Sequence, residues 1–263
     1  MPDQALNVTI ADGVAVLEMC RPDLLNRIDT QLNDELEAAV VRCASEPDVR
    51  AVVLCSTGRV FSAGGDTERM LRHRDEGPLE WMQAVDHGRR FFRLFTDFPK
   101  PLVAAVHGDV YGLGTSIVLT ADAVVSTRGV KLADPHIRMG LVAGDGGVVA
   151  WPSNMAGTLA RRHLLWGIPI LAEDAHRIGM VTDLVDTPDE VRPLALELAA
   201  QVAALPPVAV QLTKRAMNKV TSAQAEDAFD LGFYLEAMTL GSADMQEAVT
   251  AFLAKRKPTW RGR

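Results

Sequence analysis

An α/β fold is predicted for this chain of 263 residues. Short apolar runs typical of buried β-strands alternate with longer segments whose apolar residues recur at helical spacing. Two of these runs, Ala51 to Cys55 and Leu102 to Val106, are each followed by a glycine-rich turn and a helix-like segment. Such alternation favours a mainly parallel sheet that binds ligands at the carboxyl ends of its strands.

A hairpin and a helix are expected at the amino-terminal end. Leu6 to Ile10 and Val14 to Met19 are rich in β-forming residues and are joined by an Asp-Gly turn, which predicts an antiparallel hairpin. Asp29 to Ser45 follows as a helix, with Asp29 or Thr30 placed to cap it. Its apolar face consists of Leu32, Leu36, Val40 and Cys43.

The order strand, glycine turn, helix occurs twice in the middle of the chain. Backbone N–H groups at such turns can point at a ligand. After the first strand, Gly58, Gly64 and Gly65 lead into an expected helix at Thr67 to Arg72. The other elements expected here are helices at Pro78 to Phe95 and Thr115 to Ala121, and strands at Ala123 to Ser126 and Val130 to Leu132.

The carboxyl-terminal part is predicted to be almost wholly helical, with one further strand at Val181 to Val185. The expected helices span residues 158–166, 172–178, 188–205, 208–220, 223–240 and 243–255. Because the strand pattern ends before residue 190, we divide the chain into a core at residues 1–190 and a helical region at residues 191–263.

Composition and charge exclude several function classes. A net charge of −7 argues against a nucleic-acid or anionic-membrane surface. Cys20, Cys43 and Cys55 are widely spaced among apolar neighbours, so we expect reduced core residues rather than disulfides or a metal knuckle. The six histidines show no metal-ligand spacing with acidic partners, so no metal is expected. Without a signal-like segment or membrane-spanning run, we expect a cytoplasmic protein.

The segment Asp134 to Gly147 contains the candidate chemical groups. His136 and Asp145 lie in a stretch too rich in glycine for one continuous helix. A histidine titrates near neutrality, and a carboxylate can orient it or share its proton, so the pair could perform general acid–base catalysis. Two structural alternatives stay open. Asp145 could instead cap the helix that begins with the following apolar run, and His136 could be an ordinary solvent-facing loop residue.

Five motifs, taken in order, give the chain a family resemblance. They are Arg21-Pro22 with Asn26, the loop F-S-A-G-G-D at 61–66, A-A-V-H-G at 104–108, L-A-D-P-H-I-R-M-G-L at 132–141, and the ending A-F-L-A-K-R-K-P at 251–258. On these motifs the chain resembles the crotonase superfamily, the enoyl-CoA hydratase and isomerase family, over nearly its whole length.

The resemblance implies both a fold and a substrate class. The expected fold is a spiral of ββα units with a carboxyl-terminal helical trimerisation region, assembled as a homotrimer or a dimer of trimers. The implied substrate is an acyl-CoA thioester, and coenzyme A enters only as part of that substrate. Its carbonyl oxygen would lie between the backbone N–H groups of Gly65 and Leu113, an oxyanion hole for an enolate. Ala63, Asp66 and Lys255 are the implied further substrate contacts.

The chain departs from the resemblance at the catalytic positions. Hydratases of this type use two glutamates, and the corresponding positions here are Ser116 and His136. His136 with Asp145 is similar to the pair in the superfamily's β-diketone hydrolases, which cleave a C–C bond. We therefore expect a lyase or isomerase acting on acyl-CoA, with a C–C hydrolase or an inactive acyl-CoA-binding paralogue as alternatives.

Overall fold

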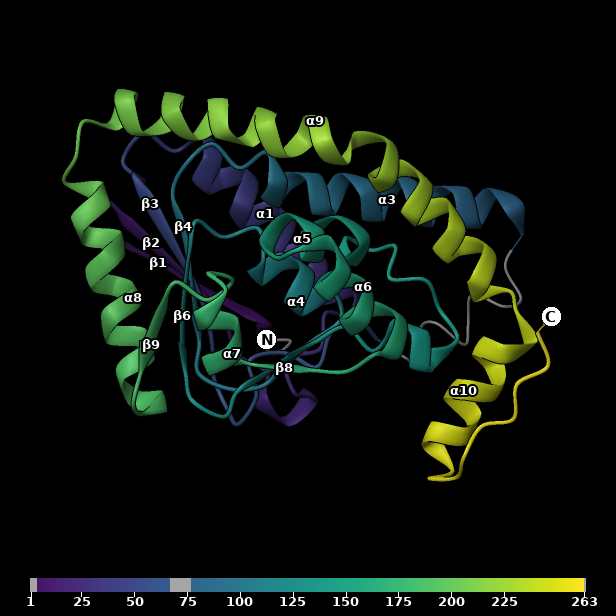
Figure 1. The fold of residues 1–263 in the computed structure, drawn as a ribbon. Helices are drawn as coiled ribbons and strands as arrows, with labels where there is room; N and C mark the ends of the chain where they lie inside the picture. Colours follow the sequence, from purple (N-terminus) through teal and green to yellow (C-terminus); the bar gives the residue numbers. More distant parts are fainter. Residues whose placement is uncertain (1–3, 67–76, 263) are drawn as a thin grey trace.

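The computed structural model describes residues 4–66 and 77–262 and has the α/β architecture predicted from the sequence (Figure 1). Its main sheet has six strands in the order β1-β2-β3-β4-β6-β9. Only the β1–β2 hairpin is antiparallel, and the later strands are added in parallel. The strands are β1 (Leu6–Ala11), β2 (Val14–Met19), β3 (Ala51–Ser56), β4 (Leu102–Val106), β6 (Ala123–Thr127) and β9 (Asp183–Val185).

A second, three-stranded sheet lies beside the turns that follow β3 and β4. It has the order β5-β7-β8, formed by β5 (Val110–Tyr111), β7 (Lys131–Ala133) and β8 (Ile170–Leu171). The sequence predicted β7 but neither β5 nor β8, because a two-residue strand is too short to show an alternating pattern.

Helices cover both faces of the main sheet. Successive strand residues point to opposite faces, so Val53 packs under the alanine-rich side of α8 (Pro188–Ala203), whereas Leu54 joins the larger core beneath α1 (Thr30–Ser45). Figure 1 shows α8 alone on its side of the sheet and most other helices on the opposite side. The boundary expected at residue 190 falls inside α8, and the division into two regions stays a prediction.

The remaining helices surround the ends of the strands. They are η1 (Pro22–Leu24), α3 (Pro78–Thr96), α4 (Leu113–Val118), η3 (His136–Met139), α5 (Gly147–Asn154), α6 (Gly157–Trp166), α7 (Ala172–Arg177), α9 (Pro207–Leu240) and α10 (Ala243–Leu253). The long helix α9 crosses the top of the molecule in Figure 1 and packs against α3 and α5. The helix expected at Thr67 to Arg72 lies outside the described residues.

The prediction of two helices at residues 208–220 and 223–240 is wrong. The structure has one helix of 34 residues there, α9. The residues between the two expected helices, Thr221 and Ser222, are weak helix formers, but neither glycine nor proline interrupts the backbone. Packing along α3 and α5 therefore carries the helix through that point.

No single helix in the described parts of the chain is long and apolar enough to cross a membrane. Helix α8 and residues 207–222 reach the required length and composition only as a pair, and that pair is bent by 109°. The cytoplasmic location expected from the sequence stays a prediction.

Candidate functional site

A mostly apolar cavity lies between α1, α3, α9 and the turns that follow β3 and β4. Its walls are formed by Ile28, Asn33, Gly65, Asp66, Trp81, Ala84, Val85, His87, Gly88, Phe91, Leu113, Asp145, Phe233, Glu236, Ala237 and Leu240. A concave apolar site with a few polar side chains is the usual form of a small-molecule site. The predicted residues Gly65, Asp66, Leu113 and Asp145 all reach it.

A glycine allows the two turns to meet at this cavity. Gly64 has a φ of +86°, and a Cβ atom there would lie 2.7 Å from the Tyr111 carbonyl oxygen. The turns are joined by a hydrogen bond of 3.0 Å from the Tyr111 N–H to the Ser62 carbonyl. This close approach brings Gly65 and Leu113 to the same cavity. Neither of their N–H groups donates a backbone hydrogen bond within the described ranges, so both remain free to bind a ligand oxygen.

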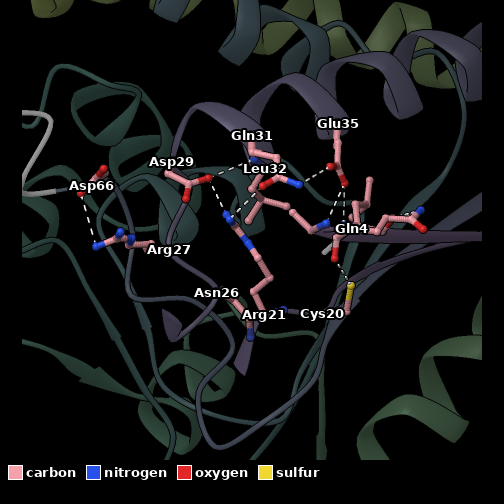
Figure 2. A network of polar contacts seen from close by, with 12 residues as sticks. Gln4, Cys20, Arg21, Asn26, Arg27, Asp29, Gln31, Leu32, Glu35 and Asp66 are labelled. Carbon is pink, nitrogen blue, oxygen red and sulfur yellow. Dashed lines mark hydrogen bonds and ion pairs between the residues drawn. The ribbon is translucent and has the colours of Figure 1, made fainter. Parts of the chain in front are cut away.

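The Arg21 and Asn26 motif supports the first turn from the outside. The Asn26 side chain is buried and donates to the Thr57 carbonyl at 2.7 Å. Arg21 forms an ion pair with Asp29, the residue whose side chain caps α1 (Figure 2). Ile28, which follows Asn26 closely, donates its N–H to the Gly64 carbonyl at 2.8 Å. The motif therefore fixes the backbone that precedes Gly65.

His136 lies between two carboxylates. Its Nδ1 is 2.5 Å from Asp134 Oδ1, and its Nε2 is 3.2 Å from Asp145 Oδ2. The His136 side chain is 6% exposed and that of Asp145 is 18% exposed. Asp145 reaches the cavity wall, whereas His136 lies behind it. The structure thus brings the predicted pair together and adds Asp134, whose role the sequence analysis missed.

The surroundings of His136 favour its charged form. Burial by itself lowers the pKa of His136, but the charges and hydrogen bonds of Asp134 and Asp145 outweigh it and raise that pKa well above the usual value. The raised pKa favours the imidazolium form, whose Nε2 faces Asp145 Oδ2. The other oxygen, Asp145 Oδ1, has no hydrogen-bond partner among the described residues.

Glu236 of α9 adds a further acid to the cavity wall. Burial of its carboxyl group is the main cause that raises its pKa well above the usual value, and the charge of Asp145 adds to this effect, while His136 opposes it. This shift favours the protonated form of Glu236. A glutamate in a long helix with apolar and polar sides is usually solvent-exposed, so the sequence pattern gave no sign of this role.

Glycines in the 144–147 loop permit this cluster. A Cβ atom at Gly144 would lie 2.1 Å from the Gly232 carbonyl oxygen and 2.7 Å from Glu236 Cβ, both on α9. A Cβ atom at Gly147 would lie 2.2 Å from Asp134 Oδ2. The glycine content that excluded a continuous helix at the sequence level thus allows Asp145 to approach both His136 and Glu236.

Both structural alternatives for the pair are wrong. Helix α5 has Gly146 at its N-cap, with a φ of +119° and no side-chain capping bond. Asp145 faces His136 instead, because the left-handed turn at Gly146 places the Asp145 carboxylate away from the first turn of the helix. His136 is buried rather than solvent-facing, because η3 turns its ring inward between the two carboxylates.

The other predicted substrate contacts differ in position. Asp66 lines the cavity and lies 3.6 Å from Arg27 in an ion pair (Figure 2). Ala63 is exposed and uses its N–H on the Leu25 carbonyl at 2.9 Å. Lys255 is exposed just after the end of α10 and does not line the cavity described above. Ser116 is buried in α4, and its hydroxyl has no hydrogen-bond partner among the described residues.

The ligand atoms of Asp134, His136 and Asp145 lie within 4.8 Å of one another, a spacing that could hold a metal ion. The spacing of these three residues along the sequence did not indicate that their ligand atoms lie close together. His136 nevertheless faces one carboxylate with each ring nitrogen, so an ion at either nitrogen would have only one of the two carboxylates on its side. Protein metal sites bring three or more ligands to a common point, whereas these two carboxylates lie on different sides of the His136 ring.

Known proteins resemble this chain in sequence and fold over nearly its whole length. A family model described as enoyl-CoA hydratase/isomerase matches residues 9–263. The 1,2-epoxyphenylacetyl-CoA isomerase of Escherichia coli (strain K12) is 30% identical over 259 residues, with 97% of both chains covered. The short-chain-enoyl-CoA hydratase of Clostridium acetobutylicum is 29% identical, with 93% of this chain and 92% of the relative covered. A crystal structure of an enoyl-CoA hydratase/isomerase from Mycobacterium paratuberculosis superimposes with a TM-score of 0.88 at 31% identity, covering 94% of this chain and 98% of that chain.

Proposed function

The chain belongs to the enoyl-CoA hydratase/isomerase family and has its α/β fold, and from this premise we propose that it converts an acyl-CoA thioester through an enolate. Two features of the cavity support the proposal. One is the pair of backbone N–H groups at Gly65 and Leu113, which donate no hydrogen bond among the described residues. The other is the Asp145 carboxylate on the same cavity wall.

The two N–H groups would stabilise the enolate oxygen. When a proton leaves the carbon next to the thioester carbonyl, the electron pair moves onto the carbonyl oxygen. Fixed amide donors aimed at that oxygen stabilise the developing charge without reorganising. Leu113 is the first residue of α4, so its N–H has no partner within the helix, and the helix dipole adds positive potential there.

Asp145 is the proposed proton-transferring residue, and this assignment rests on its place in the cavity wall with a buried Oδ1 that has no hydrogen-bond partner among the described residues. It takes the proton from the α-carbon and, for an isomerisation, returns it to a different carbon of the same enolate. His136 acts from behind Asp145 as a positioning residue, because its imidazolium binds Oδ2 and fixes the carboxylate. This refines the sequence hypothesis, in which His136 and Asp145 together perform general acid–base catalysis.

A C–C hydrolase is the second candidate, and it is favoured by the raised pKa of Glu236, which stabilises the protonated form of that carboxyl group. In a retro-Claisen reaction, water adds to one carbonyl, the C–C bond breaks, and its electron pair becomes an enolate that must accept a proton. Asp145 could deprotonate the water and Glu236 could supply the proton. Two carboxyl groups on one wall, of which Glu236 has the raised pKa, suit this division of labour.

Hydrogen–deuterium exchange at the α-carbon of a saturated acyl-CoA in D₂O tests the leading proposal. The wild type should exchange the α-proton, and Leu113→Pro should lower the rate about 10²–10³-fold by deleting one oxyanion donor. Proline is tolerated at the first helical position, and Leu113→Ala, which keeps the N–H, is the matched control.

Three outcomes separate the candidate functions. Exchange that depends on Asp145 supports the enolate proposal. Cleavage of a CoA-free cyclic β-diketone without affinity for acyl-CoA would favour the hydrolase instead. Tight acyl-CoA binding without exchange, hydration, isomerisation or cleavage would indicate an inactive binding paralogue.

A further inference from the structure

A second polar group lies in the cavity apart from the Asp134, His136 and Asp145 cluster. Asn33 of α1 and His87 of α3 both line the cavity, and Asn33 Nδ2 is 2.8 Å from His87 Nε2. The surrounding wall is apolar, with Val85, Phe91 and Phe233 among its residues. We refer to Asn33 and His87 as the polar pair.

Asn33 occupies a position where an apolar residue would be expected from stability alone. It is 7% exposed, beside the apolar face of α1 that contains Leu32 and Leu36. Burying an amide costs free energy unless its hydrogen bonds are satisfied. Within the described chain the Asn33 side chain bonds to His87, and this contact leaves its carbonyl oxygen and one amide hydrogen available.

The contact with Asn33 also determines which hydrogen-bonding atoms His87 can offer to a ligand. With Asn33 Nδ2 as donor, His87 Nε2 is the acceptor, and the proton of a neutral ring is then on Nδ1. Nδ1 makes no hydrogen bond to another described residue. The polar pair therefore offers two N–H donors, one on Asn33 and one on His87, and one carbonyl acceptor.

We propose that the polar pair recognises an oxygen function, a ketone or a hydroxyl, on the acyl part of the substrate. The inference rests on the proposed function, because it assumes that the acyl group occupies this cavity. It narrows the substrate class from acyl-CoA thioesters in general to those whose acyl group carries an oxygen in addition to the thioester carbonyl. A site built to hydrogen-bond such an oxygen discriminates strongly against a ligand that lacks it, since the site's polar groups are then left unpaired.

Calorimetric affinities for hexanoyl-CoA and its keto analogues, with the carbonyl moved one carbon at a time along the chain, test the proposal. For at least one carbonyl position, the keto analogue should bind the wild type at least about tenfold more tightly than hexanoyl-CoA, as one good hydrogen bond provides. Asn33→Leu should remove this preference, so that the best keto analogue binds the variant no more tightly than hexanoyl-CoA does.

His87 provides an independent check and a matched control. His87→Leu should abolish the preference, whereas His87→Gln keeps an N–H donor and should retain part of it. Thermal melting establishes that each variant is folded. If the wild type binds every keto analogue no better than hexanoyl-CoA, the pair only bridges α1 and α3 and the inference is wrong. If hexanoyl-CoA itself does not bind, the proposed function fails instead, so the two failures are distinguishable.

Discussion

Asp145 lines the cavity, and His136 and Asp134 behind it fix the orientation of its carboxylate. Its Oδ2 faces a buried imidazolium that Asp134 holds from the other side, while its Oδ1 has no hydrogen-bond partner among the described residues. The orientation of this carboxylate is fixed before a substrate binds, because the His136 ring holds its Oδ2. Substitutions of Asp145, His136 and Glu236 test these contacts.

Replacing the members of the Asp145–His136 unit should lower turnover without abolishing binding. Asp145→Asn and His136→Ala are each expected to reduce the rate of α-proton exchange about 10²–10⁴-fold. Affinity for a saturated acyl-CoA should change much less, because the amides of Gly65 and Leu113 remain. The double variant should lose little more than the worse single variant, since residues acting as one unit are non-additive. A fully active Asp145→Asn enzyme would refute the assignment, and an additive double variant would show that the two act separately.

Glu236 should make stability depend on pH in a definite direction. Its folded pKa is raised, so the group favours folding only while protonated, and that contribution is lost as pH rises from the unfolded value towards the folded one. Glu236→Gln keeps the shape and cannot ionise. The melting temperature of the variant should be close to that of the wild type near pH 4. At pH 7 it should be higher, by roughly 2–4 °C for each 1 kcal/mol gained in the free energy of unfolding.

His136 should also make stability fall as pH rises, so the measurement on Glu236 needs a control. Its folded pKa is also raised, so its stabilisation is complete below the unfolded value, about 6.5, and is lost as pH rises through the folded pKa. The comparison of Glu236→Gln with wild type should therefore be repeated in a His136→Asn background. If Glu236→Gln leaves the melting temperature at pH 7 unchanged in both backgrounds, Glu236 is ionised in the folded protein.

At the scale of elements, the site depends on how closely the 143–147 loop approaches α9. The loop supplies Asp145 and the helix supplies Glu236, and they meet because Gly144 and Gly232 present no side chains to each other. Helix α9 can span this distance because it is continuous through residues 207–240. An interruption where the sequence pattern suggested two helices would have changed the direction of the segment that carries Glu236.

Gly144→Ala tests this contact between the loop and the helix. The new methyl would lie 2.1 Å from the Gly232 carbonyl oxygen, a backbone atom that cannot rotate away. We expect a loss of about 1–3 kcal/mol in the free energy of unfolding, as for other overpacked sites, together with lower turnover. Gly157→Ala is the matched control, since nothing lies within 4 Å of its Cβ position. Urea denaturation and exchange kinetics of both variants measure the effect, and unchanged stability of Gly144→Ala would show that the loop is free to move.

At the scale of the whole molecule, apolar side chains remain exposed along α9 and α10. Val208 is 69% exposed, Met238 71% and Phe252 63%. Large exposed apolar areas usually mark contacts with another molecule. The trimer or dimer of trimers expected from the family resemblance would cover such a surface, and this assembly is a proposal.

Light scattering at micromolar concentration should give the mass of three or six chains of 28.5 kDa. A charge placed on the exposed surface, as in Met217→Glu, should weaken the assembly, because Met217 is 63% exposed in the isolated chain and would be buried in a helical interface. Arg215→Glu on the same helix, a polar position, is the comparison. A monodisperse wild-type monomer would contradict the prediction.

Lys255 is the remaining predicted contact for coenzyme A. It follows α10 with a φ of +52° and is exposed away from the described cavity, so any role must involve the part of the ligand outside the cavity. Lys255→Ala should weaken acyl-CoA binding at low salt several-fold, because a charge-assisted phosphate contact is lost. Lys257→Ala removes a nearby exposed charge and serves as control. Equal affinities of wild type and Lys255→Ala would end this assignment.

The sequence by itself determined the α/β class and most helix and strand positions, and it suggested, without deciding, that the two glycine turns converge and that His136 pairs with Asp145. These features depend on local patterns: apolar periodicity, glycine at tight turns and a polar pair in a short segment. They also depend on motifs whose order along the chain is visible without coordinates.

Only the tertiary structure decided which residue of the pair reaches the cavity and which groups surround it. Asp134 is two residues from His136, but the inward turn of η3 makes them partners. Glu236 and the polar pair come from segments far apart in sequence, and their roles arise from burial and proximity. A linear pattern contains neither quantity, because pKa shifts and hydrogen-bond partners depend on what the folded chain places nearby.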